Sequence, residues 1–502
     1  LEYRGYDSAG VVVVEDQGSL RRSRTVGRVK ALEEALADYP LSGRAGLGHT
    51  RWATHGGVTE PNAHPHICRD TLALVCNGIV ENHGSLRQGQ HEAGLPFTSE
   101  TDTEVVVHQV YLHLESGFDL VSAVQRTLGE LEGSFAFGVV HANEPDRIVV
   151  ARQGPPLLIG IGEEGFFVAS DIAALLPVTR TYQVLENGDV ADLRGDNCTI
   201  VTRSGEKVQR PTLYSRQSGE AAELGEYRHF MQKEIHEQAR AVADTLEGRV
   251  SGERVLEDSF GHRASELFNR TEAVQIIACG TSFHAGLVAK HWLEYVGVPC
   301  DVEIASEYRY RRHPNQAGTL AVTISQSGET ADTLAALEEA KRQNILGSMT
   351  ICNVPESSLV RESDLRFMTH AGPEVGVAST KTFTSAMTGL MLLALVLSRR
   401  HGFDKGFEAH VVSQLRALPS ALEDALAMEP EIAKVACHFG DKHHALFLGR
   451  GAHYPIALEG ALKLKEISYV HAEAYPAGEL KHGPLALVDE DMPVVVVAPN
   501  DQ

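Results

Sequence analysis

The chain has 502 residues and a mass of 54.5 kDa, which is enough for about three domains with hydrophobic cores of ordinary size. Its formal net charge of −22 disfavours nucleic acid and anionic membrane surfaces as partners. The 7 cysteines are widely spaced and form no C-x-x-C pair, which excludes a disulfide framework and a zinc site and predicts a cytoplasmic protein.

The two ends of the chain interrupt recognisable patterns. It begins at Leu1 without an initiator methionine or a signal-peptide pattern, and it ends at Gln502 soon after the apolar run 492–498. We therefore expect a fragment that is cut at both ends, with the C-terminal cut inside the last domain.

Residues 1–213 are predicted to form a strand-rich domain. Short apolar runs alternate there with turns that contain glycine, asparagine and aspartate, and few helices interrupt them. A polar stretch at 214–226 reads as a linker, and helical spacing resumes at 230–246. The predicted strands are 10–14, 71–75, 135–140, 147–150 and 166–170, and the predicted helices are 103–114 and 120–131.

This domain carries four polar blocks, which are HTRWATHG at 49–56, NAHPH at 62–66, CNGIVEN at 76–82 and SETDTE at 99–104. A substrate with an α-carboxylate, an α-ammonium group and a reacting amide needs an arginine, a carboxylate and donors for the oxyanion. Arg51, Asp102 and the pair Asn77 with Gly78 can supply these groups.

Structural explanations compete for each of these residues. An isolated Asn-Gly pair is more often a hairpin turn than an oxyanion hole. Arg51 and Asp102 would more often form a structural ion pair. His64 and His66 have the spacing of metal ligands, but they lack cysteine or carboxylate partners nearby. We therefore expect these two histidines to be structural and hydrogen-bonded, and we predict no metal site.

From about residue 270 the pattern changes to apolar strand, loop with glycine or serine, and long helix, which is typical of a parallel α/β sheet. Two copies can be aligned, 274–279 with 445–448 and 319–324 with 492–498. The longest uncharged stretch, 382–398, is shorter than the about 20 residues that a membrane span needs, so we expect a buried helix and no membrane partner. The predicted segments are a first subdomain with its leading helix at 227–402, connecting helices at 403–436 and an incomplete second subdomain at 437–502.

Two loops of this half carry the groups that bind a phosphate monoester. They are TISQSGETADT at 323–333 and CGTS at 279–282. Backbone N–H groups at a helix N-terminus and neutral donors favour a phosphate, and no G-x-G-x-x-G or Walker pattern assigns that phosphate to a nucleotide. For either loop alone, a serine N-cap with ordinary turn residues is the alternative.

A third group of polar residues lies on an otherwise apolar helix predicted at 455–470. Steps of four and three residues place Glu459, Lys463 and Glu466 on one face, where burial can shift a pKa towards acid–base chemistry. A simple surface pair between Glu459 and Lys463 is the alternative. The block AGELKHGP then places His482 in a loop bounded by glycine and proline, which suits a proton donor.

The blocks of the first domain, together with LEYRGYDSAG at 1–10, resemble the N-terminal-nucleophile glutaminase domain of the glucosamine-6-phosphate synthase family, the isomerising glutamine:fructose-6-phosphate amidotransferases. The resemblance implies a four-layer αββα fold. It implies that Arg51 binds the glutamine carboxylate, Asp102 its ammonium group, and that Asn77 with Gly78 forms the oxyanion hole. The remaining implied roles are Thr54 and His55 as residues that help to hold glutamine, and Trp52 as the gate of an ammonia channel.

The nucleophile of this family is an N-terminal cysteine whose own amine serves as the base, roughly twenty residues upstream of the block 1–10. The chain starts after that position. Leu1 cannot replace the nucleophile, and neither Cys68 nor Cys76 presents a free α-amine. We therefore expect the polypeptide as printed not to hydrolyse glutamine.

The later blocks, with EVGVASTKTFT at 374–384 and DKHHALFLGRG at 441–451, resemble the sugar-isomerase half of the same family, so the resemblance covers essentially the whole chain. It implies two parallel-sheet sugar-isomerase (SIS) subdomains. It implies Glu466 as the base that moves a proton between C1 and C2, His482 as the group that assists ring opening, and Lys463 as support for proton transfer. The residues implied to hold the sugar phosphate are Thr281, Ser282, Ser325, Gln326, Ser327 and Thr330, with Val377 in a loop that contacts the sugar by its backbone.

The resulting prediction is an α/β and α+β multidomain enzyme of amino-sugar biosynthesis. It would make glucosamine 6-phosphate and glutamate from fructose 6-phosphate and glutamine, as a homodimer and without a metal or an organic cofactor. The family's Schiff-base lysine lies in a tail beyond this chain, and we assign that role to neither Lys463 nor Lys465.

Two other functions stay open. A non-catalytic sugar-phosphate sensor would keep the phosphate loops, but it has no need for Arg51, Asn77 and Asp102. A related amidotransferase with another sugar acceptor would share most of the motifs.

Overall fold

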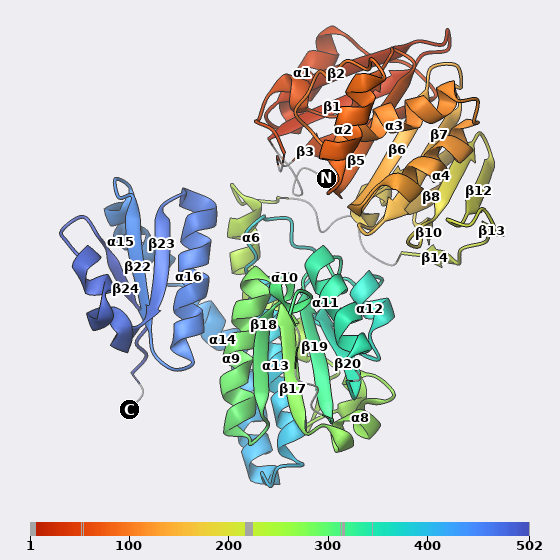
Figure 1. Cartoon of the computed structure of the whole chain (residues 1–502). Coiled ribbons are helices and arrows are strands. Elements are labelled where there is room, and N and C mark those ends of the chain that lie inside the picture. The colour runs from red at the N-terminus through yellow and green to blue at the C-terminus, as the bar shows by residue number, and fades with distance from the viewer. Residues whose placement is uncertain are drawn as a thin grey trace. The chain divides into compact units, whose positions relative to one another are not determined.

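The computed structural model shown in Figure 1 describes residues 7–51, 53, 55–215, 224–311, 313, 317–343 and 345–500. The chain divides into two compact units, Leu1–Glu220 and Ala221–Gln502. We refer to them as the first and the second unit and describe each by itself. The division falls inside the polar stretch 214–226.

A seven-stranded antiparallel sheet with the order β13-β12-β11-β7-β6-β5-β4 forms the centre of the first unit. Helices α3 and α4 cover one face, where Val106 and Val124 pack against Leu74. Helix α2 lies beside α3. The bounds are β4 His66–Cys68, β5 Leu72–Val80, β6 Gly133–His141, β7 Arg147–Gln153, β11 Val190–Arg194, β12 Asn197–Val201, β13 Lys207–Val208, α2 His83–Glu92, α3 Thr103–Glu115 and α4 Leu120–Glu130.

Two smaller antiparallel sheets, β2-β1-β3 and β14-β10-β8-β9, cover the other face of this sheet. Successive residues of β8 point in opposite directions, so Ile159 packs against the central sheet while Leu158 packs beside α5. Helix α1 packs on β1 and β2. The layers therefore follow the predicted αββα order. The bounds are β1 Ser8–Val14, β2 Leu20–Val26, β3 Ala45–Arg51, β8 Leu158–Gly162, β9 Gly165–Ala169, β10 Thr181–Val184, β14 Thr212–Tyr214, α1 Val29–Asp38 and α5 Ile172–Leu175.

Helices α3 and α4 confirm the two helices expected in the first unit. Asp119 begins α4, where its carboxylate accepts hydrogen bonds from the N–H groups of Val121 and Ser122. Helices α1 and α2 were not predicted. Helix α2 has two glycines and a single large apolar residue, Leu86, so its stability depends on packing against α3.

The second unit begins with two helices where the sequence predicts one over 230–246. Helix α6, Phe230–His236, ends at Glu237, and α7, Gln238–Leu246, starts directly after it. A five-stranded parallel sheet follows, with the order β18-β17-β19-β20-β21 and with α9 and α13 on one face and α10 and α11 on the other. The bounds are β17 Ala273–Ala278, β18 Cys300–Ile304, β19 Thr319–Ser325, β20 Gly347–Cys352, β21 Leu365–Met368, α8 Ala264–Arg270, α9 Gly280–Tyr295, α10 Ala305–Tyr308, α11 Ala331–Arg342, α12 Ser358–Glu362 and α13 Lys381–Ser398.

The last part of the second unit repeats this plan. Its parallel sheet has the order β23-β22-β24, which corresponds to β18-β17-β19, and α16 occupies the place of α9 after the first strand. The structure therefore confirms the internal repeat expected from the sequence. The bounds are α14 Lys405–Leu426, α15 Glu429–Ala436, β22 His444–Gly449, α16 His453–Ser468, β23 His471–Pro476 and β24 Val494–Val496, and a short hairpin of β15 Val250–Ser251 and β16 Arg254–Val255 lies earlier in the unit.

Helix α13 is, within the described residues, the one helix long and apolar enough to cross a membrane by length and composition, and 78% of its apolar window is buried inside the protein. Its side chains pack against α7 and α9 and form much of the largest hydrophobic cluster. This burial agrees with the buried helix predicted for 382–398.

The first prediction concerns this core helix. Leu393 is fully buried in the cluster, so Leu393→Ala is expected to lower the free energy of unfolding of the second unit by about 2–5 kcal/mol. Ile432→Ala on α15 is the matched control, because Ile432 is 58% exposed. Urea unfolding can be followed by the fluorescence of Trp292 in a Trp52→Phe background. Equal effects of the two substitutions would contradict the assigned core.

Candidate active sites in the two units

The first unit contains a cavity of about 720 Å³, which we call the first-unit cavity. Residues of the edge strands β3 and β9 and of the central strands β5 and β6 line it. Trp52 and Thr54 lie outside the described residues. The other glutamine-site residues expected from the sequence all line this cavity: Arg51, His55, Asn77, Gly78 and Asp102.

Asn77 and Gly78 lie within strand β5 and not at a turn. They pair with Ala136 and Phe135 of β6, so the hairpin explanation for this pair is wrong. Gly78 has a φ of 126°, and a Cβ atom there would lie 2.1 Å from the carbonyl oxygen of Ser134. Only glycine fits this backbone, because any side chain would collide with the neighbouring strand.

Asp102 immediately precedes α3, where the helix dipole favours a negative charge. Its side-chain Oδ2 accepts a 2.8 Å hydrogen bond from the Val80 N–H, and the residue is 5% exposed. Glu104 fixes the preceding loop, since its carboxylate accepts 2.7 Å bonds from both the N–H and the hydroxyl of Ser99. The sequence block SETDTE therefore builds the support of Asp102 as well as the carboxylate itself.

Arg51 is 4% exposed at the end of β3. Its Nη2 donates a 2.6 Å hydrogen bond to the carbonyl of His55, and its Nη1 donates a 3.2 Å bond to the carbonyl of Gly57. Among the described residues no ion pair joins Arg51 to Asp102, in contrast to the structural explanation considered above. The guanidinium therefore shapes the loop 55–57 that borders the cavity.

Three histidines form a cluster beside this cavity, in which His64 and His66 are buried and His49 is half-buried. The rings of His49 and His64 are 4.2 Å apart, and those of His64 and His66 are 4.9 Å apart. Burial lowers the pKa of His49 to about 4 and holds the pKa values of His64 and His66 well below their usual range, and nearby arginines lower them further. His66 Nε2 lies 3.0 Å from the Thr101 hydroxyl. No group of metal-binding side chains occurs among the described residues.

Neither cysteine near this cavity is an activated thiol. Burial raises the pKa of Cys68 to about 12, and burial together with the Asp102 charge raises the pKa of Cys76 further. Both side chains therefore stay protonated at neutral pH, and a protonated thiol is a weak nucleophile.

The second prediction follows from the cluster of His49, His64 and His66. The three imidazoles are neutral in the folded state but take up protons below about pH 6.5 once unfolded, so they favour unfolding as the pH falls from 6.5 towards 4. The first unit is expected to be fully stable above about pH 6.5 and to lose up to about 4 kcal/mol per pH unit below it. Urea unfolding at a series of pH values measures this slope.

Two variants control this experiment. His49→Asn is expected to reduce the slope by about a third, since one of three titrating groups is lost. His91→Asn changes an exposed histidine of the same unit and should leave the slope as it is. A pH-independent stability between pH 7.5 and 5 would show that these histidines have the same pKa values in the folded and the unfolded protein.

The second unit contains a cavity of about 180 Å³, the second-unit cavity, beyond the carboxyl ends of β17 and β19. Parallel strands place the loops that follow them at one edge of the sheet, which brings the two serine-rich loops together. Every residue expected from the sequence to hold the phosphate lines it, together with Val377, which was expected to contact the sugar, and two residues of α16: Thr281, Ser282, Ser325, Gln326, Ser327, Thr330, Val377, Lys463 and Glu466.

The loop between β19 and α11 is held by its own hydroxyl groups. Ser325 Oγ lies 3.0 Å from Thr330 Oγ1 and accepts a 3.0 Å hydrogen bond from the Gly328 N–H. Thr330 precedes α11, but its side chain does not cap the helix. The N-cap explanation is therefore wrong for this loop. Gly328 is required by its φ of 66° and by Ser357, whose Oγ would lie 1.9 Å from a Cβ.

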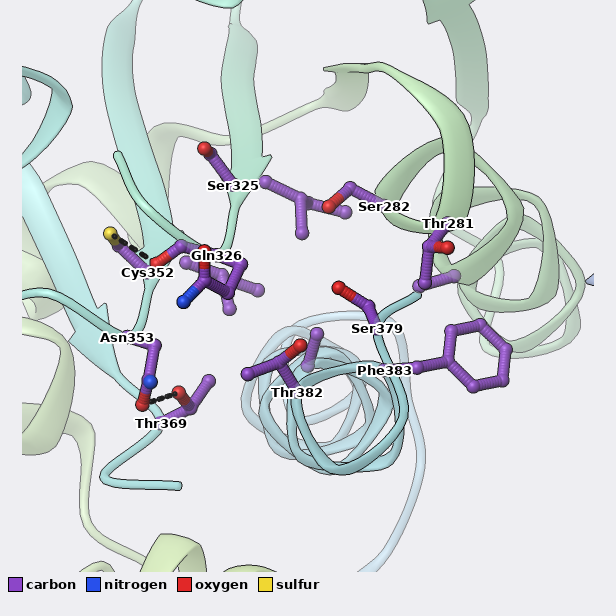
Figure 2. A pocket seen from close by; sticks show the side chains of 14 residues that line it. Thr281, Ser282, Ser325, Gln326, Cys352, Asn353, Thr369, Ser379, Thr382 and Phe383 are labelled. Atoms are coloured by element: carbon purple, nitrogen blue, oxygen red, sulfur yellow. Dashed lines mark hydrogen bonds between the residues drawn. The ribbon is translucent and has the colours of Figure 1, made fainter. Parts of the chain in front are cut away.

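A smaller cavity of about 20 Å³ adjoins these loops. Figure 2 shows Ser379, just before α13, and Thr382, in its first turn, facing the residues at the end of β19. Asn353 and Thr369 also line this smaller cavity, and the Thr369 hydroxyl donates a 2.9 Å hydrogen bond to Asn353. Ser379 lines the two cavities described here for the second unit, but it is not among the site residues expected from the sequence. Its position two residues after Val377 in the block EVGVASTKTFT was the available signal.

Helix α16 contributes a chain of charged groups to the second-unit cavity. Lys463 Nζ lies 2.5 Å from Glu466 Oε2 and 3.4 Å from Glu459 Oε1. Glu459 also accepts a 2.9 Å hydrogen bond from the Thr281 hydroxyl and lies 2.8 Å from His284 Nδ1, both on α9. Glu459 is 6% exposed, so the surface-pair explanation for Glu459 and Lys463 is wrong.

His482 lies apart from this group. It ends the 3-10 helix Ala477–His482, its side chain is exposed, and it is not among the described residues that line the cavity. Within one chain, the structure therefore brings together Lys463 and Glu466 but not His482.

Comparison with known proteins agrees with this division. Residues 36–202 match the glutamine amidotransferase domain family, and residues 267–396 and 438–502 match the SIS domain family. The chain resembles a solved C-terminal domain of glucosamine-fructose-6-phosphate aminotransferase from Francisella tularensis, with a TM-score of 0.55 and 54% identity over 56% of this chain and 79% of that one.

Relatives match over the whole chain. The glutamine–fructose-6-phosphate aminotransferase (isomerizing) of Pseudomonas aeruginosa is 57% identical over 504 aligned residues, which cover 100% of this chain and 82% of the relative. The protein of the same name from Escherichia coli strain K12 is 52% identical over 503 residues, with the same coverage. The chain therefore belongs to the family of isomerising glutamine–fructose-6-phosphate aminotransferases.

Proposed function

We propose that the protein makes glucosamine 6-phosphate and glutamate from fructose 6-phosphate and glutamine. The observation that carries this proposal is the second-unit cavity. Neutral side chains that can donate hydrogen bonds to a phosphate and the charged pair Lys463–Glu466 line the same space there. Two neighbouring strand ends supply the donors, and a helix of the repeated subdomain supplies the charges.

In the first unit, the proposed roles follow from charge and position. The Arg51 guanidinium pairs with the α-carboxylate of glutamine, and the Asp102 carboxylate with its α-ammonium group. The Asn77 side chain and the Gly78 N–H stabilise the oxyanion that forms when the amide is attacked. Thr54 and His55 help to hold glutamine, and Trp52 gates the passage of ammonia.

In the second unit, Ser325, Gln326, Ser327 and Thr330 bind the phosphate group, and Thr281 and Ser282 complete this site. The Val377 backbone contacts the sugar. Glu466 takes the C1 or C2 proton of the sugar and returns it to the neighbouring carbon, and Lys463 stabilises the carboxylate between these steps. No metal or organic cofactor takes part in this scheme.

The other functions explain less of the structure. A sugar-phosphate sensor has no use for the first-unit cavity, where Arg51, Asn77, Gly78 and Asp102 converge. An amidotransferase for another sugar would need the same residues in both cavities, so the acceptor itself is settled by assay. The free cysteines Cys68, Cys76, Cys198, Cys279, Cys300, Cys352 and Cys437 support the proposed cytoplasmic location.

The third prediction tests the proposed base. Glu466→Gln keeps the side-chain volume but removes the basic oxygen, so solvent-deuterium exchange at C1 of bound fructose 6-phosphate should slow by about 10² to 10⁴. The experiment uses a preparation in which the unsubstituted protein shows this exchange. Calorimetry should show unchanged affinity for the sugar phosphate. Glu431→Gln, at an exposed position of α15, is the matched control. Exchange at the wild-type rate in Glu466→Gln would exclude Glu466 as the base.

The fourth prediction concerns the proposed homodimer. His482 is exposed and outside the second-unit cavity of its own chain, which supports an arrangement in which it acts at the cavity of a second copy. His482→Ala and Glu466→Gln should each inactivate the isomerase. Mixed dimers of the two variants should recover about a quarter to a half of the activity, because one of their two sites is intact. No recovery in mixed dimers would place His482 at its own chain's site, and an active His482→Ala homodimer would place it outside the mechanism.

A further inference from the structure

The loop 374–380 forms one wall of the second-unit cavity. It connects β21 to α13, and Val377 and Ser379 line the cavity beside the phosphate loops. Val377 is 55% exposed, so its side chain has little packing of its own to hold the loop in place. The conformation of this wall must therefore be set by contacts of its backbone.

A buried carboxylate on α6 supplies such contacts. Glu234 is 2% exposed, and its Oε1 accepts hydrogen bonds of 2.5 Å from the Val375 N–H and 3.0 Å from the Gly376 N–H. Its Oε2 lies 3.1 Å from the same Gly376 nitrogen. Two successive backbone donors thus converge on one carboxylate, 1 and 2 residues before Val377. Hydrogen bonds to a charged acceptor are stronger than those between neutral groups.

The packing at this contact leaves no room for a side chain at residue 376. A Cβ atom on Gly376 would lie 2.5 Å from Glu234 Oε2 and 3.4 Å from the Cα of Met231 on the same helix. Burial raises the pKa of Glu234, while the N–H groups of Gly376 and Val375 lower it. The loop therefore approaches α6 closely because residue 376 is glycine, and the carboxylate meets the N–H groups that this approach exposes.

The C-terminal end of the loop, next to α13, is also held by hydrogen bonds. Glu374 accepts hydrogen bonds of 2.8 Å from the Thr380 N–H and 3.3 Å from the Thr382 N–H. Lys381, which is 3% exposed, donates a 2.7 Å bond to Glu237 at the junction of α6 and α7. Val377 and Ser379 thus lie between two anchored points.

We propose that Glu234 is a positioning residue for the sugar, because it holds the loop that carries Val377 and Ser379 at the cavity. This proposal rests on the proposed function and adds to it a residue remote from the reacting atoms. The phosphate loop does not depend on Glu234, since Ser325, Gly328 and Thr330 are held by their own hydrogen bonds. Loss of Glu234 should therefore weaken recognition of the sugar and spare recognition of the phosphate.

The fifth prediction tests this separation with Glu234→Ala and Glu234→Gln. Calorimetric titration should show about a 10-fold weaker affinity for fructose 6-phosphate in Glu234→Ala, while the affinity for inorganic phosphate changes less than about twofold. Glu234→Gln should lie between this variant and the wild type, because its carbonyl oxygen can still accept from Val375 and Gly376. Gln232→Ala changes another residue of α6, whose side chain faces Arg228 and not the loop, and is the matched control.

Hydrogen exchange separates this role from a general loss of structure. The amides of Val375 and Gly376 should exchange faster in Glu234→Ala, while those of β19 stay protected. Unchanged affinity for fructose 6-phosphate, unchanged exchange at 375 and 376, or equal weakening of both ligands would overturn the positioning role. A wild-type protein that binds inorganic phosphate but does not bind fructose 6-phosphate would instead overturn the proposed function.

Discussion

The buried carboxylate of Glu459 is the interaction on which the second-unit cavity depends. Glu459 lies on α16 of the second subdomain. It accepts a hydrogen bond from Thr281 and lies close to His284, and both of these residues are on α9 of the first subdomain. A buried charge is costly unless it is paired and hydrogen-bonded, so this carboxylate holds the two helices together at one relative position. Because Lys463 and Glu466 lie on the same helix, this contact also places them beside the phosphate loops.

The second-unit cavity divides its chemistry between neutral and charged groups. Hydroxyl and amide side chains from the ends of β17 and β19 line one part, and they suit a phosphate because they donate without changing protonation state. The charged groups all come from α16, where Lys463 lies between Glu459 and Glu466. A proton can thus be moved at one end of a bound sugar phosphate while the other end is held by groups that do not titrate.

Backbone geometry has a comparable role in the first unit. The oxyanion pair Asn77–Gly78 lies in the middle of a paired strand, where Gly78 adopts a conformation that other residues avoid. Asp102 hydrogen-bonds to Val80 of the same strand, and Arg51 holds the loop that enters the cavity from β3. Strand β5 of the central sheet therefore carries the oxyanion pair and holds the Asp102 carboxylate, while Arg51 is placed by the end of β3.

Local patterns in the sequence were sufficient for much of this architecture. Apolar periodicity predicted α3, α4 and the repeated strand–helix unit, because a helix or strand with one buried face repeats with its own period. The spacing of Glu459, Lys463 and Glu466 placed them on one helical face before any neighbour was known. The phosphate loops were predicted from their neutral side-chain donors and from the backbone N–H groups at the helix N-termini that follow them.

Contacts between distant segments were decided only by the tertiary structure. Nothing near Glu234 in the sequence indicates that its carboxylate meets the N–H groups of Val375 and Gly376. The sequence also gives no sign that the expected helix is divided at Glu237. The Asn-Gly pair looked like a turn because short-range propensity does not register the partner strand β6. Periodicity reports which face of an element is buried, but it cannot report which other element covers that face, since this depends on how the whole chain packs.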